Sequence, residues 1–178
     1  MKPKILSKKL KYKGIWAKIE ETKVELPTGK IVKWERILGS DFVAIVAIDD
    51  QMNIYLSKEW RVAWEKEIVQ IPAGEFKGRG ERARLKQARN ELREEVGLDA
   101  KKWEKLINCI FSVREKKWVH IYLATNLFKS EKKREDSEII EVVKIPFKRA
   151  YRLFLSGKVP TNSSTIMGMA LAKEKLNL

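Results

Sequence analysis

Three glutamates lie within five positions of the chain, in the stretch NELREEVGL: Glu91, Glu94 and Glu95. At about 100° per residue, positions i, i+3 and i+4 fall on one side of an α-helix, so the spacing predicts three carboxylates on one helix face. Like charges at this spacing mildly destabilise a helix. Either a bound cation or nearby basic side chains must relieve the repulsion, and Arg89 and Arg93 are candidates for the second role.

The segment before the glutamates is a glycine-rich loop. The strand pattern EIVQIP stops at Pro72, Gly74, Gly78 and Gly80 follow, and the spacing then becomes helical up to Gly97. Glycine lets backbone come close to an anion. Mg²⁺ prefers carboxylate oxygens and substrate phosphates. The loop and the carboxylate face together therefore favour a magnesium and phosphate site over a solvated helix face.

Composition limits the classes of protein that fit. The 178 residues suit one domain, or one domain with a small appendage, and a hydrophobic content of 44% argues against disorder. The net charge of +14 favours anionic partners such as nucleotides, nucleic acid or acidic membranes. Because the lysines occur as scattered doublets without a long basic run, nucleic acid is allowed as a partner but is not favoured.

The chain has one cysteine and one histidine, Cys109 and His120. An intrachain disulfide and a multi-ligand zinc site are therefore excluded. Cys109 lies in the apolar run LINCIF, which favours a buried, inert thiol, and His120 is most simply a strand histidine with a structural hydrogen bond. We find no signal-peptide pattern and no apolar stretch of membrane-spanning length. We therefore expect a cytoplasmic protein without a membrane partner.

Strand and helix patterns alternate along the chain and predict a mixed α/β layer structure. Residues 10–37 are typical of a β-hairpin that turns at LPTGK, and the continuous apolar run 41–48 predicts a buried strand. Further strands are expected in IYLSKEW, EIVQIP, 106–113, 118–125 and IIEVVKIP. Two C-terminal helices are expected at 147–156 and about 163–176, the second capped by Ser163 or Ser164.

The segment IPAGEFKGRGERARLKQARNELREEVGL resembles a Nudix box, the signature of hydrolases that cleave nucleoside diphosphates linked to another group. The end of the family pattern, R-E-U-x-E-E-x-G-U with U aliphatic, is matched from Glu91 to Leu98 except at its arginine, where this chain has Asn90. The first glycine of the box is Gly74, and its loop glutamate is Glu81. The spacing on either side of Glu81 is longer than in the family, so the resemblance assigns Glu81 no role.

The resemblance extends over nearly the whole chain to the ADP-ribose pyrophosphatase branch of the superfamily. The matching segments are YKGIW (12–16), LPTGK (26–30), EWR (59–61), QIPAG (70–74) and E-x-x-E-V at 138–142 before Pro146. Gln70 replaces a glutamate of the branch, and FSVREKKW lacks its Ser-Pro-Gly-like segment. These departures concern the substrate more than the reaction.

The resemblance implies a fold: an α/β/α sandwich with a mixed sheet at 39–178, preceded by a small antiparallel β region at 1–38 for dimerisation and substrate contact. It also implies roles. Mg²⁺, or Mn²⁺ in its place, would be held by Glu91, Glu94, Glu95 and the Ala73 carbonyl. Glu138 would position or deprotonate the attacking water, so the implied catalytic residues are Glu91, Glu94, Glu95 and Glu138. The implied substrate-binding residues are Trp16, Trp34, Glu35, Arg61 and Gly74.

Several readings stay open at this point. Trp16 and Trp34 lie in facing strands of the predicted hairpin, where they could be packing residues. Arg61 could be a surface ion-pair partner, and Glu138 a solvated loop charge. The function implied is hydrolysis of ADP-ribose or a related nucleoside diphosphate sugar to AMP and ribose 5-phosphate by a homodimer. The alternatives are a pyrophosphohydrolase of RNA ends or dinucleotide polyphosphates, and a non-catalytic nucleotide- or RNA-binding module.

Overall fold

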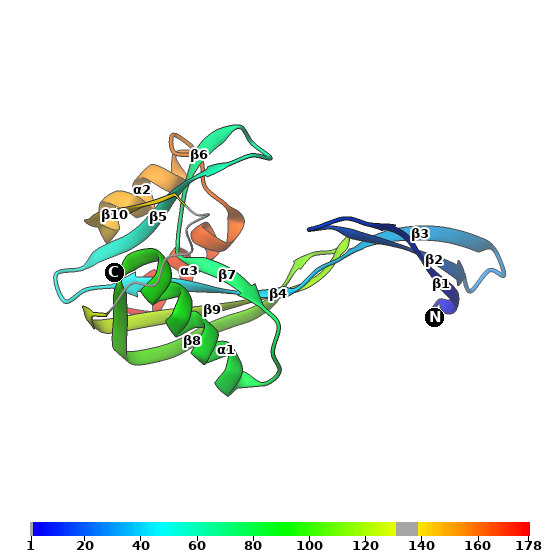
Figure 1. Cartoon of the computed structure of the whole chain (residues 1–178), viewed down its shortest axis with the longest axis horizontal. Coiled ribbons are helices and arrows are strands. Elements are labelled where there is room, and N and C mark those ends of the chain that lie inside the picture. Colours follow the sequence, from blue (N-terminus) through cyan, green and yellow to red (C-terminus); the bar gives the residue numbers. More distant parts are fainter. Residues whose placement is uncertain (1, 131–138) are drawn as a thin grey trace. The chain divides into compact units, whose positions relative to one another are not determined.

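The computed structural model describes residues 2–130 and 139–178, which form two compact units (Figure 1). The first unit comprises the chain up to Asp41 together with Cys109–Trp118, and the second comprises Phe42–Asn108 and Val119–Leu178. Two long strands, β8 (Leu98–Ser112) and β9 (Glu115–Lys129), contribute residues to both units. The first unit thus includes a segment, Cys109–Trp118, that the predicted N-terminal region 1–38 did not contain.

The first unit is built on an antiparallel sheet of three strands: β1 (Lys4–Lys13), β2 (Lys18–Glu25) and β3 (Ile31–Leu38). The predicted LPTGK turn joins β2 to β3, and Gly29 adopts a φ of 80° there, which glycine does without steric cost. The last residues of β3 pair in parallel with the start of β9, at Ile37↔Glu115 and Leu38↔Lys116.

The predicted hairpin from residue 10 to residue 37 is wrong at its beginning. A separate strand, β1, precedes it, and the chain turns between β1 and β2, where the amide N–H of Gly14 donates to the carbonyl of Ala17. Trp16 lies in this turn and is 86% exposed, so it does not face Trp34 across a strand pair. The apolar alternation of the segment did not reveal the turn, because Ile15 and Trp16 are large apolar residues in an exposed connection.

The second unit contains a mixed sheet centred on β4 (Asp41–Ile48). β4 pairs in parallel with β9, from Phe42↔Val119 to Ala47↔Ala124, and antiparallel with β5 (Asn53–Arg61). β5 also pairs with β6 (Lys66–Gln70) and β10 (Ile140–Pro146), while β7 (Ala73–Phe76) pairs with β4. The predicted continuous apolar run 41–48 is confirmed as a central strand, buried from Val43 to Ile48.

Helices cover both faces of this sheet, which explains why β4 is apolar on both sides. Val43, Ile45 and Ala47 share a core with Ala88 and Leu92 of the helical segment that begins with α1 (Glu81–Glu91). On the opposite face, Gly168 of α3 (Ser163–Lys175) lies so close to Val46, Ile71 and Ile121 that a Cβ would contact all three. Helix α2 (Phe147–Leu155) packs beside α3 (Figure 1). The predicted α/β/α sandwich is confirmed.

The N-terminus of α3 is capped by Asn162, and not by Ser163 or Ser164 as predicted. The Asn162 carboxamide oxygen accepts from the backbone N–H of Thr165 at 2.8 Å, while its Nδ2 donates to Oε1 of buried Gln70 at 2.9 Å. Gln70, which replaces a glutamate of the ADP-ribose pyrophosphatase branch, therefore accepts a hydrogen bond from the residue that caps α3. Among residues 2–130 and 139–178, no helix has the length and apolar character needed to span a bilayer.

Candidate active site

The predicted glutamate-bearing helix exists and ends at Gly97, as expected, but its last turn is wider than an α-helix. α1 continues directly into a π-helical turn, η1 (Leu92–Val96), and the Gly97 N–H bonds the carbonyls of both Arg93 and Leu92. A π turn closes i→i+5 bonds and is frequent at functional sites. The expected uniform spacing of about 100° per residue is therefore wrong between Glu91 and Glu95.

Glu95 lies in the π turn on the same buried side as Leu92, and its side chain is 5% exposed. Its Oε1 accepts from the backbone N–H of Ala73 at 3.0 Å, and the Ser57 hydroxyl is a second hydrogen-bonding neighbour. Burial raises the pKa of Glu95 to about 8, and the negative charges of Glu91 and Glu59 add to the rise. The carboxylates of Glu91 and Glu59 are thus close enough to oppose the ionisation of Glu95.

Glu91 lies against the glycine of the loop. Its carboxylate occupies the space that a Cβ at position 74 would need. Glycine is therefore required at position 74, because the Glu91 carboxylate lies so close to the backbone there. On the same helix, Gln87 Nε2 donates to Glu91 Oε1 at 2.6 Å. Gln87 was missed by the sequence analysis, although its position four residues before Glu91 was a usable signal, since side chains at i and i+4 are neighbours on a helix.

Arg61 is joined to the carboxylate cluster through Glu59. The two side chains share a face of β5, being two residues apart in a strand, and form an ion pair with Nη2 of Arg61 2.8 Å from Oε2 of Glu59. Glu59 in turn influences the pKa of Glu95. The guanidinium is therefore held beside the acidic site. Glu59 was also missed, although the alternation of strand side chains places it on the face of Arg61.

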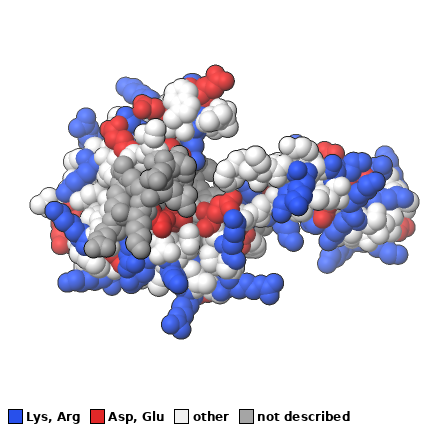
Figure 2. Space-filling model, in the orientation of Figure 1, with Lys and Arg blue, Asp and Glu red and all other residues white. Residues whose placement is uncertain are grey.

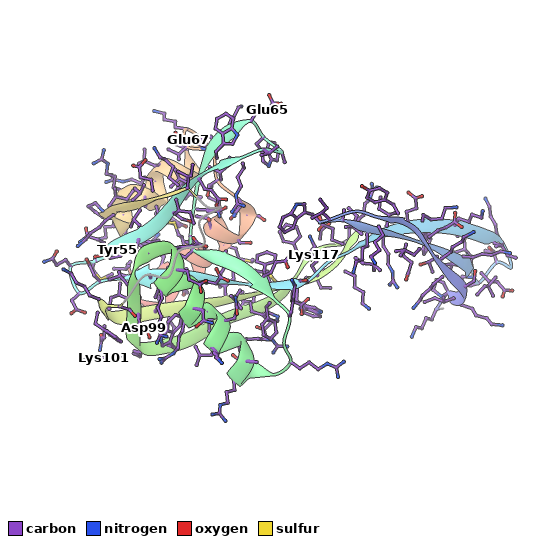
Figure 3. All side chains as sticks on the ribbon, viewed as in Figure 1. Tyr55, Glu65, Glu67, Asp99, Lys101 and Lys117 are labelled. Atoms are coloured by element: carbon purple, nitrogen blue, oxygen red, sulfur yellow. The ribbon has the colours of Figure 1, made fainter. Side chains whose placement is uncertain are left out.

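Arg89 and Arg93, the two candidates for relieving the repulsion among the glutamates, both form ion pairs with another acid. Both guanidinium groups pair with Asp99, which lies at the start of β8 and is 1% exposed (Figure 3). Arg93 Nη2 is 2.5 Å from Asp99 Oδ2, and Arg89 Nη1 is 3.6 Å from the same oxygen. These ion pairs compensate a buried charge.

Glu81, the loop glutamate of the box, begins α1 and faces away from this cluster toward β8 and β9. Its Oε1 accepts from the Tyr122 hydroxyl at 2.8 Å, and its Oε2 lies 3.2 Å from Nζ of Lys105. Partial burial opposes ionisation, but the bonds from Tyr122 and Lys105 outweigh it and lower the pKa of Glu81. The lengthened loop thus gives Glu81 a structural contact between the helix and the sheet.

The other predicted site residues are divided between the two units. Trp34 and Glu35 lie on β3 of the first unit and Trp16 in the turn before β2, and all three are exposed. Glu94, in the π turn of the second unit, is partly exposed. Glu138 lies outside the described residues. The structure therefore brings together Ala73, Gly74, Glu91 and Glu95 and adds Ser57, Glu59, Arg61 and Gln87.

Two residues singled out earlier have other roles. His120 is buried, with Nδ1 2.9 Å from Oδ1 of Asn108, so the predicted structural hydrogen bond is confirmed. Cys109 is only partly buried, which corrects the expectation of a buried thiol. Burial nevertheless raises the pKa of Cys109, and a raised pKa disfavours the reactive thiolate.

The donor set of the cluster fits a hard divalent cation. Within residues 2–130 and 139–178, no three His, Cys, Asp or Glu side chains are gathered into a ready-made metal site. Glu91 is engaged by Gln87, and Glu95 by the Ala73 N–H. Their oxygens are nevertheless of the kind that Mg²⁺ selects. A divalent cation would also remove the repulsion that helps to raise the pKa of Glu95.

Comparison with known proteins agrees with this geometry. The chain is 37% identical over 139 residues to the ADP-ribose pyrophosphatase of Bacillus subtilis (strain 168), an alignment that covers 76% of this chain and 74% of the relative. It is 34% identical over 157 residues to the ADP-ribose pyrophosphatase of Mycobacterium tuberculosis, covering 85% and 73%. The chain belongs to the ADP-ribose pyrophosphatase branch of the Nudix hydrolases.

Two further comparisons place this Nudix hydrolase among its relatives. A protein named methanol dehydrogenase activator, from Bacillus methanolicus, is 29% identical over 161 residues, covering 89% of this chain and 85% of the relative. The crystal structure of an ADP compounds hydrolase superposes with a TM-score of 0.88 at 21% identity, over 99% of this chain and 95% of the other, and shows the fold. No family model matches the chain.

Proposed function

We propose that this Nudix hydrolase cleaves the diphosphate of ADP-ribose, or of a related nucleoside diphosphate sugar, to AMP and ribose 5-phosphate. The observation that carries the proposal is the cluster of Glu59, Glu91 and Glu95 around the Ala73–Gly74 backbone, with Arg61 beside it. The names of the two ADP-ribose pyrophosphatase relatives support the choice of substrate.

The residues of the second unit divide the work of the reaction. Glu91, Glu94, Glu95 and the Ala73 carbonyl would hold Mg²⁺, or Mn²⁺ in its place. When bound, such a cation neutralises diphosphate charge and lowers the pKa of a coordinated water. Arg61 has five N–H donors in a planar fork suited to phosphate oxygens. We infer that its pair with Glu59 keeps the guanidinium in place before substrate arrives.

The chemical step consumes one water. The water oxygen forms a bond to one phosphorus, the bridging P–O bond breaks, and the proton passes to a carboxylate. Glu138 is our proposal for that base. Gly74 would contribute to the substrate site by letting the Glu91 carboxylate lie directly against the backbone beside the phosphates, because a Cβ at this position would take up the space that the carboxylate fills.

We propose that the first unit contributes the adenine contacts. Trp16 and Trp34 would stack on the base, and Glu35 would accept hydrogen bonds from its edge. Trp16 is 86% exposed and Trp34 is 53% exposed, so the aromatic surface of both side chains is available to a ligand. The first unit would act in a homodimer, where it completes the site of the neighbouring subunit.

Trp34→Ala should weaken the apparent affinity for ADP-ribose and leave turnover at saturation nearly unchanged. Stacking an aromatic side chain on a base is worth roughly 1–3 kcal/mol, and a contact that is equal in ground and transition states affects KM alone. Steady-state kinetics with ADP-ribose would measure both parameters. Val32→Ala, on the same strand, is the matched control. An unchanged KM would remove Trp34 from the adenine site.

The dimer is a separate prediction, because most of the first unit lacks a packed core. All ten residues of β1 are exposed, and this strand includes Ile5, Leu6, Leu10 and Tyr12. Small sheets need a surface to pack on, and we expect a second copy of the chain to supply it. Sedimentation equilibrium should give the dimer mass. A fully active monomer would refute the prediction.

The experiment that tests the proposed function is a substrate panel with and without Mg²⁺. ADP-ribose should release AMP in the presence of Mg²⁺, detected by chromatography, and a dinucleotide polyphosphate and a 5′-triphosphorylated RNA should react more slowly. The face in Figure 2 shows Lys and Arg dispersed over both units and interleaved with Asp and Glu, which does not favour an RNA-binding stripe. Faster cleavage of either alternative, or no cleavage of any substrate, would overturn the proposal.

A further inference from the structure

We propose that Gln87 is a positioning residue for Glu91, and that it orients this carboxylate toward the divalent cation. The inference rests on the proposed function, because it takes Glu91 to be a metal ligand. Gln87 is not one of the residues that define the Nudix box, since it falls within the interval between Glu81 and Asn90, the position of the box arginine. The family pattern alone therefore assigns it no role.

The geometry fixes Glu91 from two sides. The carboxamide of Gln87, four residues earlier on α1, donates to Glu91 Oε1 at 2.6 Å. On the other side the carboxylate lies on the backbone of Gly74, where no Cβ limits its approach. Gln87 and Glu91 are both partly buried. The amide donor thus selects one orientation of a side chain that would otherwise rotate freely about its terminal bond.

The residue at the position of the box arginine is poorly placed to orient Glu91. In this chain that position is Asn90, which has no charge and is adjacent to Glu91 in sequence. Side chains at i and i+1 of a helix do not face each other, whereas side chains at i and i+4 do. Gln87 is therefore better placed than Asn90 to reach the Glu91 carboxylate.

A neutral amide suits this task. Gln87 donates one N–H to one oxygen of Glu91 and, being neutral, leaves the negative charge of the carboxylate uncompensated. Arginine or lysine at the same place would add positive charge, which opposes binding of a divalent cation. Groups that hydrogen-bond a metal ligand from outside the metal's own coordination sphere typically affect metal affinity or activity by 10–100-fold.

The test compares Gln87→Met with Lys86→Ala in the full-length protein. Methionine keeps the length of the side chain and its helix propensity but cannot donate a hydrogen bond. Lys86 is the neighbouring residue on the same helix, and its side chain is exposed. The probe is Mn²⁺, titrated without substrate and followed by the loss of its free-ion electron paramagnetic resonance signal.

We expect Gln87→Met to raise the Mn²⁺ dissociation constant about 10-fold, with the unfolding midpoint of the metal-free protein unchanged. Turnover of ADP-ribose should then recover toward the wild-type value as Mn²⁺ is raised. Lys86→Ala should match the wild type in all three measurements. Equal dissociation constants for Gln87→Met and wild type would overturn the inference, as would a loss of affinity explained by unfolding.

The failure of this inference can be distinguished from the failure of the proposed function. If the wild type binds Mn²⁺ but leaves ADP-ribose intact, the substrate assignment is wrong, and the Mn²⁺ titration of Gln87→Met still decides the role of Gln87. If the wild type hydrolyses ADP-ribose and Gln87→Met binds Mn²⁺ as tightly, only the inference about Gln87 is wrong. If the wild type binds no Mn²⁺, both are overturned.

Discussion

Glu95→Gln should lose at least about 10³-fold in turnover while its metal-free form becomes more stable than the wild type. A metal contributes several kcal/mol to stabilising charge in the transition state, and each 1.36 kcal/mol is a factor of ten in rate. Stability should rise because Glu95 is 5% exposed and its ionisation is opposed by burial and by two neighbouring carboxylates. A glutamine oxygen can still accept from the Ala73 N–H.

The stability difference should depend on pH with a defined sign. The pKa of Glu95 is raised from 4.5 to about 8 in the folded protein, so between these values the folded state binds more protons than the unfolded state. Stability of the metal-free wild type therefore falls as pH rises through this window. The advantage of Glu95→Gln should be absent near pH 4 and reach on the order of 2 kcal/mol or more above pH 8.

Chemical denaturation of metal-free protein at pH 5, 7 and 9 would measure this trend, with ADP-ribose hydrolysis measured in parallel. Glu75→Gln is the matched control, because Glu75 is an exposed acid on β7. It should change neither activity nor the pH dependence. Wild-type turnover in Glu95→Gln would show that this carboxylate holds no essential cation, and a stability difference that is constant with pH would contradict the raised pKa.

The sequence was sufficient to locate the site but not to describe its interior. Motif and periodicity predicted a strand, a glycine loop and a helix ending at Gly97. The strand and the helical segment are where they were expected, but the first part of the predicted loop is the strand β7. The π turn was not predictable from spacing, because Leu92–Val96 satisfies the apolar pattern of an ordinary helix. Within this turn Glu95 is buried and Glu94 is partly exposed.

Partners that come from distant segments were the second kind of information missing from the sequence. Arg89 and Arg93 are near Glu91 along the helix, but they pair with Asp99. Asp99 is only 1% exposed, so its negative charge needs a positive partner. Likewise Glu81 is bonded by Tyr122, 41 residues away. Which acid a basic side chain pairs with depends on which acid is buried in the folded protein, and local sequence patterns do not show this.

Gly74→Ala should lower the rate of ADP-ribose hydrolysis by about 10²-fold or more without unfolding the protein. The new Cβ would overlap the Glu91 carboxylate, which is the far end of a flexible side chain and can move away. Moving it breaks the bond from Gln87 and displaces a metal ligand, and a misplacement of about 1 Å at a reacting centre can cost 10²-fold. Stability should hold, because replacing Gly by Ala also reduces the entropy of the unfolded chain.

Gly78→Ala should show the opposite pattern and is therefore the sharpest comparison. Its Cβ would lie 2.7 Å from the Phe76 ring, which is 5% exposed and packed in the core beneath α1, so the clash falls on a group with no room to move. We expect Gly78→Ala to lower the unfolding midpoint but to bind Mn²⁺ with wild-type affinity when folded. For Gly74→Ala we expect a wild-type midpoint and weakened Mn²⁺ binding. If both variants lose stability and metal affinity together, the close approach of Glu91 to Gly74 is a packing contact and not the support of a metal ligand.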